Sequence, residues 1–383
     1  MSRGRGRGAA RARGRARGRG GRAPALKRKR SPVRSEVEES SEAEDGGVEI
    51  EQPADSTVLT ITQFPGQWGS FAGDCAVVET PTHFWIIDLG TTKTFDTKLQ
   101  PVKRALALAK ELKARGKTGS LIITHFHDDH TAGGAELTKL NALFSKLYYG
   151  STTTDVGTTA LAARFERAFS NGKLKKLTVA STVNKIQDED TGSCTIGVSI
   201  LTPAHVVNPS ENCMSLGVLF TLTPNGATQP TFSFLSLGDM TPNAADAVVA
   251  KVQTVLAGGA KEQKQQKKKG KVEPKTVSLL KFPHHGSESN YIPSLDHLVG
   301  DTTQVIISGY TGTVPTSLQR LHKKNPSGIS ILTTKTRHDA FKNSAPASYN
   351  IVTAECGVAF KGTFTGTVKL SGATEYSYLA SWS

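Results

Sequence analysis

A seven-residue stretch, Thr124-His125-Phe126-His127-Asp128-Asp129-His130, places the strongest constraint on how this chain can fold. Three imidazoles and two carboxylates fall within six consecutive positions of it. The apolar run at residues 120–123 predicts a short buried strand before the stretch, and a helical pattern begins shortly after residues 131–134. The cluster is therefore expected on a loop between a strand and a helix, where several side chains can converge on one point.

The residue types in this stretch are those of a metal site. Imidazole nitrogens and carboxylate oxygens suit borderline divalent metals such as zinc, manganese or iron. A spacing of two lets His125 and His127 point to the same side of an extended segment, and Asp129 and His130 follow on the turn, where a second ion could be held. The alternative is a polar surface loop that is rich in histidine by chance, which the density of ligands in one loop disfavours.

The formal net charge of +14 is spread unevenly along the chain. Residues 1–34 hold fourteen Arg or Lys and no acid, in Arg-Gly repeats of low complexity, and we expect a disordered basic tail there. Residues 35–55 hold nine acids and no base, which predicts an acidic linker. Strand-like alternation begins near residue 57, so residues 56–383 are expected to form the folded domain.

The basic tail suggests a partner and a location. Arg-Gly segments bind nucleic acid through phosphate charge and guanidinium stacking, and the alternative is a solubilising tail. Residues 27–32, Lys-Arg-Lys-Arg-Ser-Pro, resemble a nuclear import signal, which predicts an intracellular protein that is nuclear wherever the cell has a nucleus. The four widely spaced cysteines favour a reducing compartment, and the chain has no apolar run long enough to predict a membrane span.

Helical and strand patterns alternate along the domain, which predicts a layered α/β fold. Helices are expected at residues 101–113, 135–148, 158–170 and 244–256. Polar groups recur directly after apolar strands, at Asp88, at the histidine cluster, at Asp239 and at the pair His284-His285, so we expect one site at a sheet edge. Residues 261–275 hold seven Lys and two Glu and predict a flexible loop that attracts a phosphate backbone, the alternative being a solvated insertion.

Four sequence blocks carry a family resemblance. They are Gly73-Asp74-Cys75-Ala76 with Ile86-Ile87-Asp88; His125-x-His127-x-Asp129-His130; Asn212-x-x-Ser215-Leu216 with Leu237-Gly238-Asp239; and Phe282-Pro283-His284-His285-Gly286-Ser287. With them, residues 57 to about 340 resemble the metallo-β-lactamase superfamily, and more narrowly the hydrolase domains of ComEC competence proteins. The resemblance implies an αββα sandwich, in which two mixed β-sheets are flanked by helices.

The resemblance also implies a role for each candidate residue. His125 and His127 would hold a first ion, Asp129 and His130 a second, and Asp239 would bridge the two. One of His284 and His285 would complete the second site, and the sequence leaves open which. Asp88 would orient the cluster from behind the ligands. Asp129, Asp239 and Asn212 are the residues expected to act in catalysis.

The middle block departs from the superfamily pattern. Most members supply one more histidine there, whereas this chain has Asn212, with His205 nearby. His205 could bind the metal or could be a loop histidine without a metal, and the sequence favours neither. The first metal site could therefore be weaker than in most members.

A two-metal hydrolase is the function that these features favour. Two divalent ions, zinc before manganese, would activate a hydroxide and neutralise charge on a phosphoryl or acyl oxygen. The basic segments favour a nuclease or phosphodiesterase acting on DNA or RNA. The alternatives are a hydrolase of a small ester, lactone or phosphodiester, and a nucleic-acid-binding protein with an inactive hydrolase fold. The sequence does not predict an oligomeric state.

Overall fold

The computed structural model describes residues 57–64, 74–90, 101–136, 141–150, 156–169, 171–177, 183–192, 194–203, 210–259, 275–286, 292–308, 320–321, 323–324, 329–333, 350–353 and 360–365. All of them belong to one compact unit, Gln52–Ser383. The predicted basic tail, the acidic linker, His205 and the predicted basic loop up to residue 274 lie outside the described residues.

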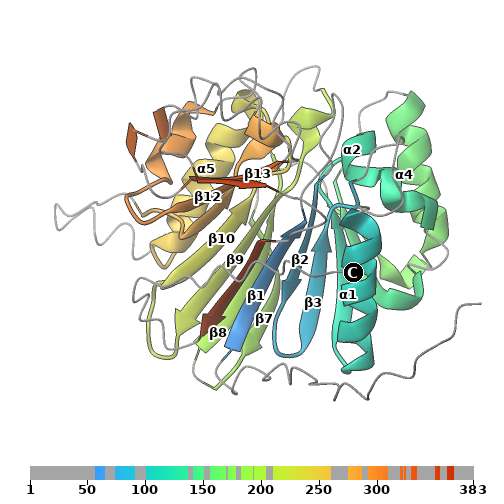
Figure 1. Cartoon of the computed structure of the whole chain (residues 1–383), viewed down its shortest axis with the longest axis horizontal. Coiled ribbons are helices and arrows are strands. Elements are labelled where there is room, and N and C mark those ends of the chain that lie inside the picture. The colour runs from blue at the N-terminus through green and yellow to red at the C-terminus, as the bar shows by residue number, and fades with distance from the viewer. Residues whose placement is uncertain are drawn as a thin grey trace, which may run out of the picture. The chain divides into compact units, whose positions relative to one another are not determined.

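Two mixed β-sheets form the centre of this unit (Figure 1). The first has the strand order β15-β1-β2-β3-β4-β5-β6 and the second the order β14-β13-β12-β11-β10-β9-β8-β7. The first sheet comprises β1 (Thr57–Phe64), β2 (Cys75–Glu79), β3 (His83–Ile87), β4 (Thr118–Ile123), β5 (Phe144–Tyr149), β6 (Leu174–Lys176) and β15 (Phe360–Thr365). The second comprises β7 (Val183–Asp190), β8 (Cys194–Leu201), β9 (Gly217–Pro224), β10 (Phe232–Ser236), β11 (Leu279–Lys281), β12 (Gln304–Ser308), β13 (Ile329–Thr333) and β14 (Asn350–Thr353).

The central strands are apolar on both faces because both faces are covered. In β3, Trp85 and Ile87 belong to the core between the sheets, while Phe84 and Ile86 belong to the core under the helices. The alternation follows from the strand geometry, in which successive side chains point to opposite faces. Such doubly covered strands appear in the sequence as continuous apolar runs rather than as alternating ones.

Helices cover the outer face of each sheet (Figure 1). Side chains of α1 (Pro101–Ala114) and α4 (Val156–Ala168) share a core with the outward residues of β2 to β5. On the other side, α5 (Pro242–Leu256) packs Val248 and Val252 in one core with β10 and β11. The predicted αββα sandwich is therefore confirmed. None of the helices in the described ranges is long and apolar enough to cross a membrane.

The predicted helix at residues 135–148 is wrong from residue 144 onward, whereas residues 141–143 are helical. Beyond η1 (Ala132–Glu136), residues 144–149 form β5, which pairs in parallel with β4. Phe144, Leu147 and Tyr149 pack under the helices, whereas Tyr148 faces the opposite sheet. Aromatic residues favour strands, and burial on both faces removed the period-two signal that would have distinguished a strand from a helix. The other three predicted helices are confirmed to within two residues at each end.

Strand pairing brings several loops to one edge of each sheet. In the first sheet β4 is parallel to β3 and β2 is antiparallel to it, so the ends of β3 and β4 lie beside the start of β2. In the second sheet β11 is parallel to β10, and the loops that follow them are neighbours. A hydrogen bond from Leu216 N to Thr124 O, 2.9 Å long, joins the two edges.

Candidate metal centre

The loop after β4 directs two histidines to the same point. Phe126 is buried in the core and its backbone N donates a hydrogen bond to Glu211 Oε1 (3.1 Å). With Phe126 turned inward, His125 and His127 face the opposite way, and His125 Nε2 lies 3.1 Å from His127 Nδ1. The expected common orientation of these two histidines is present in the structure.

Asp88 holds the third histidine of the cluster. Its carboxylate accepts hydrogen bonds from Thr124 N and Thr124 Oγ1, each 2.7 Å long, and Asp88 Oδ2 lies 2.7 Å from His130 Nδ1. His130 sits in the short helix α2 (Asp128–Thr131) and is fully buried. Because Nδ1 faces Asp88, the Nε2 atom of His130 points into the cluster, 3.2 Å from Asp239 Oδ1.

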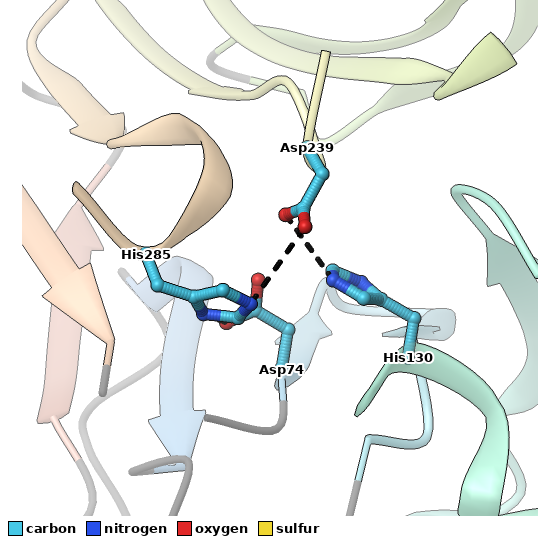
Figure 2. A group of neighbouring side chains, drawn as sticks. All are labelled: Asp74, His130, Asp239 and His285. Carbon is cyan, nitrogen blue, oxygen red and sulfur yellow. Dashed lines mark ion pairs between the residues drawn. The ribbon is translucent and has the colours of Figure 1, made fainter. Parts of the chain in front are cut away.

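Asp239 is the centre of the arrangement. It follows β10, is 1% exposed, and its backbone N donates to Ser215 Oγ (3.2 Å). Figure 2 shows its carboxylate pointing between His130 and His285, with Asp74 on the far side. Its Oδ2 atom also lies near three imidazole nitrogens, at 3.9 Å from His125 Nε2, 3.6 Å from His284 Nε2 and 3.8 Å from His285 Nε2.

The histidine pair reaches the centre from η4 (Pro283–Gly286). Both residues have positive φ, 49° for His284 and 52° for His285, a conformation that is uncommon for residues other than glycine. His284 N donates a hydrogen bond to Gly238 O (3.1 Å), which ties the pair to the Asp239 turn. His285 Nε2 also lies 3.3 Å from Asp129 Oδ2.

Two residues of the site, Asp74 and Lys281, were missing from the candidates that we drew from the sequence. Lys281 ends β11 and forms a buried ion pair with Asp74, which stands directly before β2. Asp74 Oδ1 lies 3.9 Å from His285 Nδ1. Asp74, His130, Asp239 and His285 each offer one ligand atom within 4.8 Å of the others. Two features of the sequence could have indicated these residues: Asp74 is a carboxylate at the start of an apolar strand, and Lys281 is a lysine inside one.

Charges in this cluster shift its pKa values strongly. Burial alone would raise the pKa of Asp239, but the positive charges of His130 and His285 hold it well below its usual range. Burial would lower the pKa of His130, but the carboxylates of Asp239, Asp88 and Asp129 raise it well above. Burial and the charge of His130 lower the pKa of His125. The carboxylate of Asp239 thus lies beside positively charged imidazoles. A metal ion at the same place would favour the charged form of the carboxylate in the same way.

Glycines at two turns allow this close approach. Gly90 N donates to Asp74 O (2.7 Å), and Asp74 N donates to Asp129 O (3.0 Å). A Cβ atom on Gly90 would overlap both of those backbones. Gly238 has φ +56°, and a Cβ atom there would lie 2.8 Å from Thr124.

The structure thus brings most of the predicted site residues to one point. They are His125, His127, Asp129, His130, Asp239, His284 and His285, with Asp88 directly behind His130. Asn212, in η3 (Asn212–Met214), lies at the rim, with Nδ2 3.4 Å from His284 Nε2. His205 lies outside the described residues. Ligation itself stays a prediction for all of them.

Unsatisfied polar atoms test whether a cation suits this donor set. Within the described part of the chain, four buried atoms here make no hydrogen bond: His130 Nε2, Asn212 Oδ1 and both oxygens of Asp239. His130 Nε2 and Asp239 Oδ1, 3.2 Å apart, form an ion pair. Buried polar atoms are almost always satisfied, and a bound ion is one common reason for an exception. The nitrogen and oxygen donors therefore fit a divalent cation.

Comparison with known proteins agrees with this architecture. The model of the metallo-β-lactamase superfamily matches residues 68–218, which contain β2 to β8 and the histidine cluster. Three solved structures of low identity also align. YhfI from Bacillus subtilis, described as a metallo-β-lactamase fold protein, is 14% identical, with a TM-score of 0.38, over 79% of this chain and 99% of its own.

The other two structures are a diphosphatase of the PhnP family and zinc-bound PqqB from Methylobacterium extorquens. The first is 10% identical, with a TM-score of 0.36, over 78% of this chain and 96% of its own. The second is 10% identical, with a TM-score of 0.39, over 78% and 99%. No curated protein matches the chain by sequence.

Proposed function

We propose that this chain, which has the metallo-β-lactamase fold, is a metal-dependent nuclease or phosphodiesterase acting on DNA or RNA. The narrower likeness to ComEC hydrolase domains belongs to the same proposal. One observation carries it: Asp239 is a buried carboxylate with four imidazole nitrogens within 3.9 Å of its oxygens. A buried carboxylate is costly unless positive charge lies beside it, and a pair of metal ions would supply that charge.

The donors divide into two groups around Asp239. His125 Nε2 lies 3.1 Å from His127 Nδ1, and His285 Nε2 lies 3.3 Å from Asp129 Oδ2, so we assign the first pair to one ion and the second pair, with His130, to the other. Asp239 Oδ1 lies 3.2 Å from His130 Nε2 and Asp239 Oδ2 lies 3.9 Å from His125 Nε2, so Asp239 would contribute to both ions. We expect two divalent ions per chain, with zinc as the first choice for this donor set and manganese as the alternative.

Ions bound there would lower the pKa of a water molecule and neutralise charge on a phosphoryl or acyl oxygen. The protein's own contribution is orientation. Asp88 holds His130 through Nδ1 and Asp74 faces Nδ1 of His285, so both rings turn Nε2 toward Asp239. Asn212 is half-buried beside His284, where its amide could donate a hydrogen bond to a substrate oxygen.

Charge in the sequence supports nucleic acid as the substrate. The fourteen basic residues before position 35 and the seven lysines of residues 261–275 would attract a phosphate backbone. Gly259 and Lys275 flank this segment, after α5 and before β11, and because β11 is parallel to β10 they lie toward the end of the sheet opposite Asp239. The import-like segment Lys27-Arg28-Lys29-Arg30 supports action in the nucleus of a nucleated cell.

A substrate panel tests the proposal. Zinc-loaded and chelator-treated full-length protein is incubated with labelled single- and double-stranded DNA and RNA, a small phosphodiester, a small ester and a lactone. We expect cleavage of nucleic acid by the loaded protein only. Turnover of the small substrates alone would replace the proposal with a small-molecule hydrolase. Nucleic-acid binding without any turnover would indicate an inactive fold.

A further inference from the structure

The adjacent residues His284 and His285 both turn toward one carboxylate oxygen, which neighbours in a regular strand do not do. His284 Nε2 lies 3.6 Å and His285 Nε2 3.8 Å from Asp239 Oδ2. In a strand, neighbouring side chains point to opposite faces. Here the left-handed backbone of both residues brings the two rings to the same place, with ring centroids 6.1 Å apart. We infer that the pair divides between two cations, His284 joining His125 and His127, and His285 joining His130 and Asp129.

The surroundings of His285 assign it to the second group. Its Nε2 atom is 3.3 Å from Asp129 Oδ2, and His285, His130, Asp74 and Asp239 each offer one ligand atom within 4.8 Å of the others. Its Nδ1 atom faces Asp74 at 3.9 Å, as Nδ1 of His130 faces Asp88 at 2.7 Å. The two rings are therefore arranged alike, each with a carboxylate behind Nδ1 and with Nε2 directed to Asp239. Such pairing with a carboxylate is usual for histidines that bind metals.

The surroundings of His284 place it with the first group. Its Nε2 atom is 3.6 Å from Asp239 Oδ2, which is also 3.9 Å from His125 Nε2, and the ligand atoms of Asp74, His130, Asp239 and His285 that lie within 4.8 Å of one another include His285 but not His284. His125 Nε2 is in turn 3.1 Å from His127 Nδ1. His284 Nε2 is also 3.4 Å from the amide of Asn212, the residue of the middle block where a third histidine was expected and is absent. His284 thus supplies an imidazole where that block has none.

The backbone of the pair supports a function for both rings. Residues other than glycine rarely adopt positive φ, and consecutive cases mark sites where the surrounding structure imposes the conformation. Here the hydrogen bond from His284 N to Gly238 O and the burial of Pro283 and Gly286 hold it in place. A single ligand at this turn would require only one of the two residues to face the centre.

Metal stoichiometry tests the division, which rests on the proposed two-cation site. Full-length variants His284→Asn, His285→Asn, His284→Asn/His285→Asn and His125→Asn/His284→Asn are loaded with zinc chloride, desalted and analysed for tightly bound zinc per chain. Asparagine tolerates positive φ, so the turn should survive. His297→Asn, which alters an exposed histidine of η6 (Pro293–His297), is the matched control, and thermal melts check folding.

The double variants give opposite outcomes under the two assignments. We expect two zinc ions in the wild type and in the control, one in either single variant, none in His284→Asn/His285→Asn and one in His125→Asn/His284→Asn. One ion in the first double variant and none in the second would overturn the division. So would a His284→Asn protein that keeps both ions. Wild type with fewer than two ions would remove this inference, whereas two divided ions without nucleic-acid cleavage would sink only the proposed substrate. If the asparagine variants fail to fold, His284→Gln and His285→Gln are read by the same criteria.

Discussion

Asp88 Oδ2 lies 2.7 Å from His130 Nδ1, and both groups are buried. The carboxylate of Asp88 also accepts two hydrogen bonds from Thr124, which hold it in place. This contact determines which nitrogen of His130 is left for the centre, because Nδ1 is occupied. The orientation of a ligand histidine is therefore set by a residue that does not itself reach Asp239.

Replacing Asp88 should weaken metal binding without removing a ligand. In Asp88→Asn an NH2 group replaces one carboxylate oxygen. This group cannot accept a hydrogen bond, so the variant side chain cannot accept all the hydrogen bonds that Asp88 receives from Thr124 and His130. We expect zinc affinity to fall by about 10- to 100-fold, the range usual for partners behind metal ligands. Competition with a chromophoric chelator measures it, with Asp246→Asn on the exposed face of α5 as control. Unchanged affinity in Asp88→Asn would contradict the orienting role.

Substitution of Gly90 should reduce metal binding as much as substitution of a metal ligand, although Gly90 offers no donor atom. A Cβ atom at this position would overlap the backbones of Asp74 and Asp129. In Gly90→Ala the two loops must separate, so Asp129 moves away from His285. We expect loss of at least one bound zinc and a lower melting temperature. Gly172→Ala, where a Cβ atom meets nothing within 4 Å, is the control and should keep both. Equal zinc content in the two variants would show that the loops tolerate the shift.

The buried pair of Asp74 and Lys281 predicts a strong coupling in stability. Lys281→Met would remove the closest cation from the buried Asp74 carboxylate, and breaking a buried ion pair from one side costs about 3–5 kcal/mol. Asp74→Asn in the same background removes that charge, so the double variant should be less destabilised than the sum of the single variants. Urea unfolding of the four chelator-treated proteins gives the coupling. If the changes in the free energy of unfolding are additive, the interaction between Asp74 and Lys281 does not contribute to stability.

Removing residues 1–55 should separate binding from metal loading. The fold begins at β1, whereas the densest positive charge lies before residue 35. We expect a folded protein with unchanged zinc content, weaker binding to nucleic acid and a shallower dependence of affinity on salt, because fewer phosphates are contacted. Fluorescence anisotropy at several salt concentrations measures this. The same affinity and salt slope in both proteins would exclude a role for the tail.

Much of the site could be predicted from local sequence. The spacing of His125 and His127 sets their common direction, because it depends only on the period of an extended chain. Asp88 and Asp239 were found because each ends an apolar strand. The fold class followed from the alternation of apolar runs and helical patterns.

The rest depends on geometry that a local pattern does not contain. Asp74 reaches the centre because β2 runs antiparallel to β3, which places the start of one strand beside the end of the other. The orientations of His284 and His285 depend on a left-handed turn that their residue types do not favour. Residues 144–148 were included in a predicted helix because a strand buried on both faces leaves no period-two pattern.

The central claim is that Asp239 supports hydrolysis of nucleic acid by holding two cations. The most direct measurement compares wild type with Asp239→Asn on the same labelled DNA and RNA, at equal protein and zinc concentrations. An amide is nearly the same size but lacks the charge that holds two cations together, so the rate should fall by several orders of magnitude. Affinity for nucleic acid should stay within about twofold, because the basic segments bind phosphate without metal. Equal cleavage by the two proteins would contradict the claim.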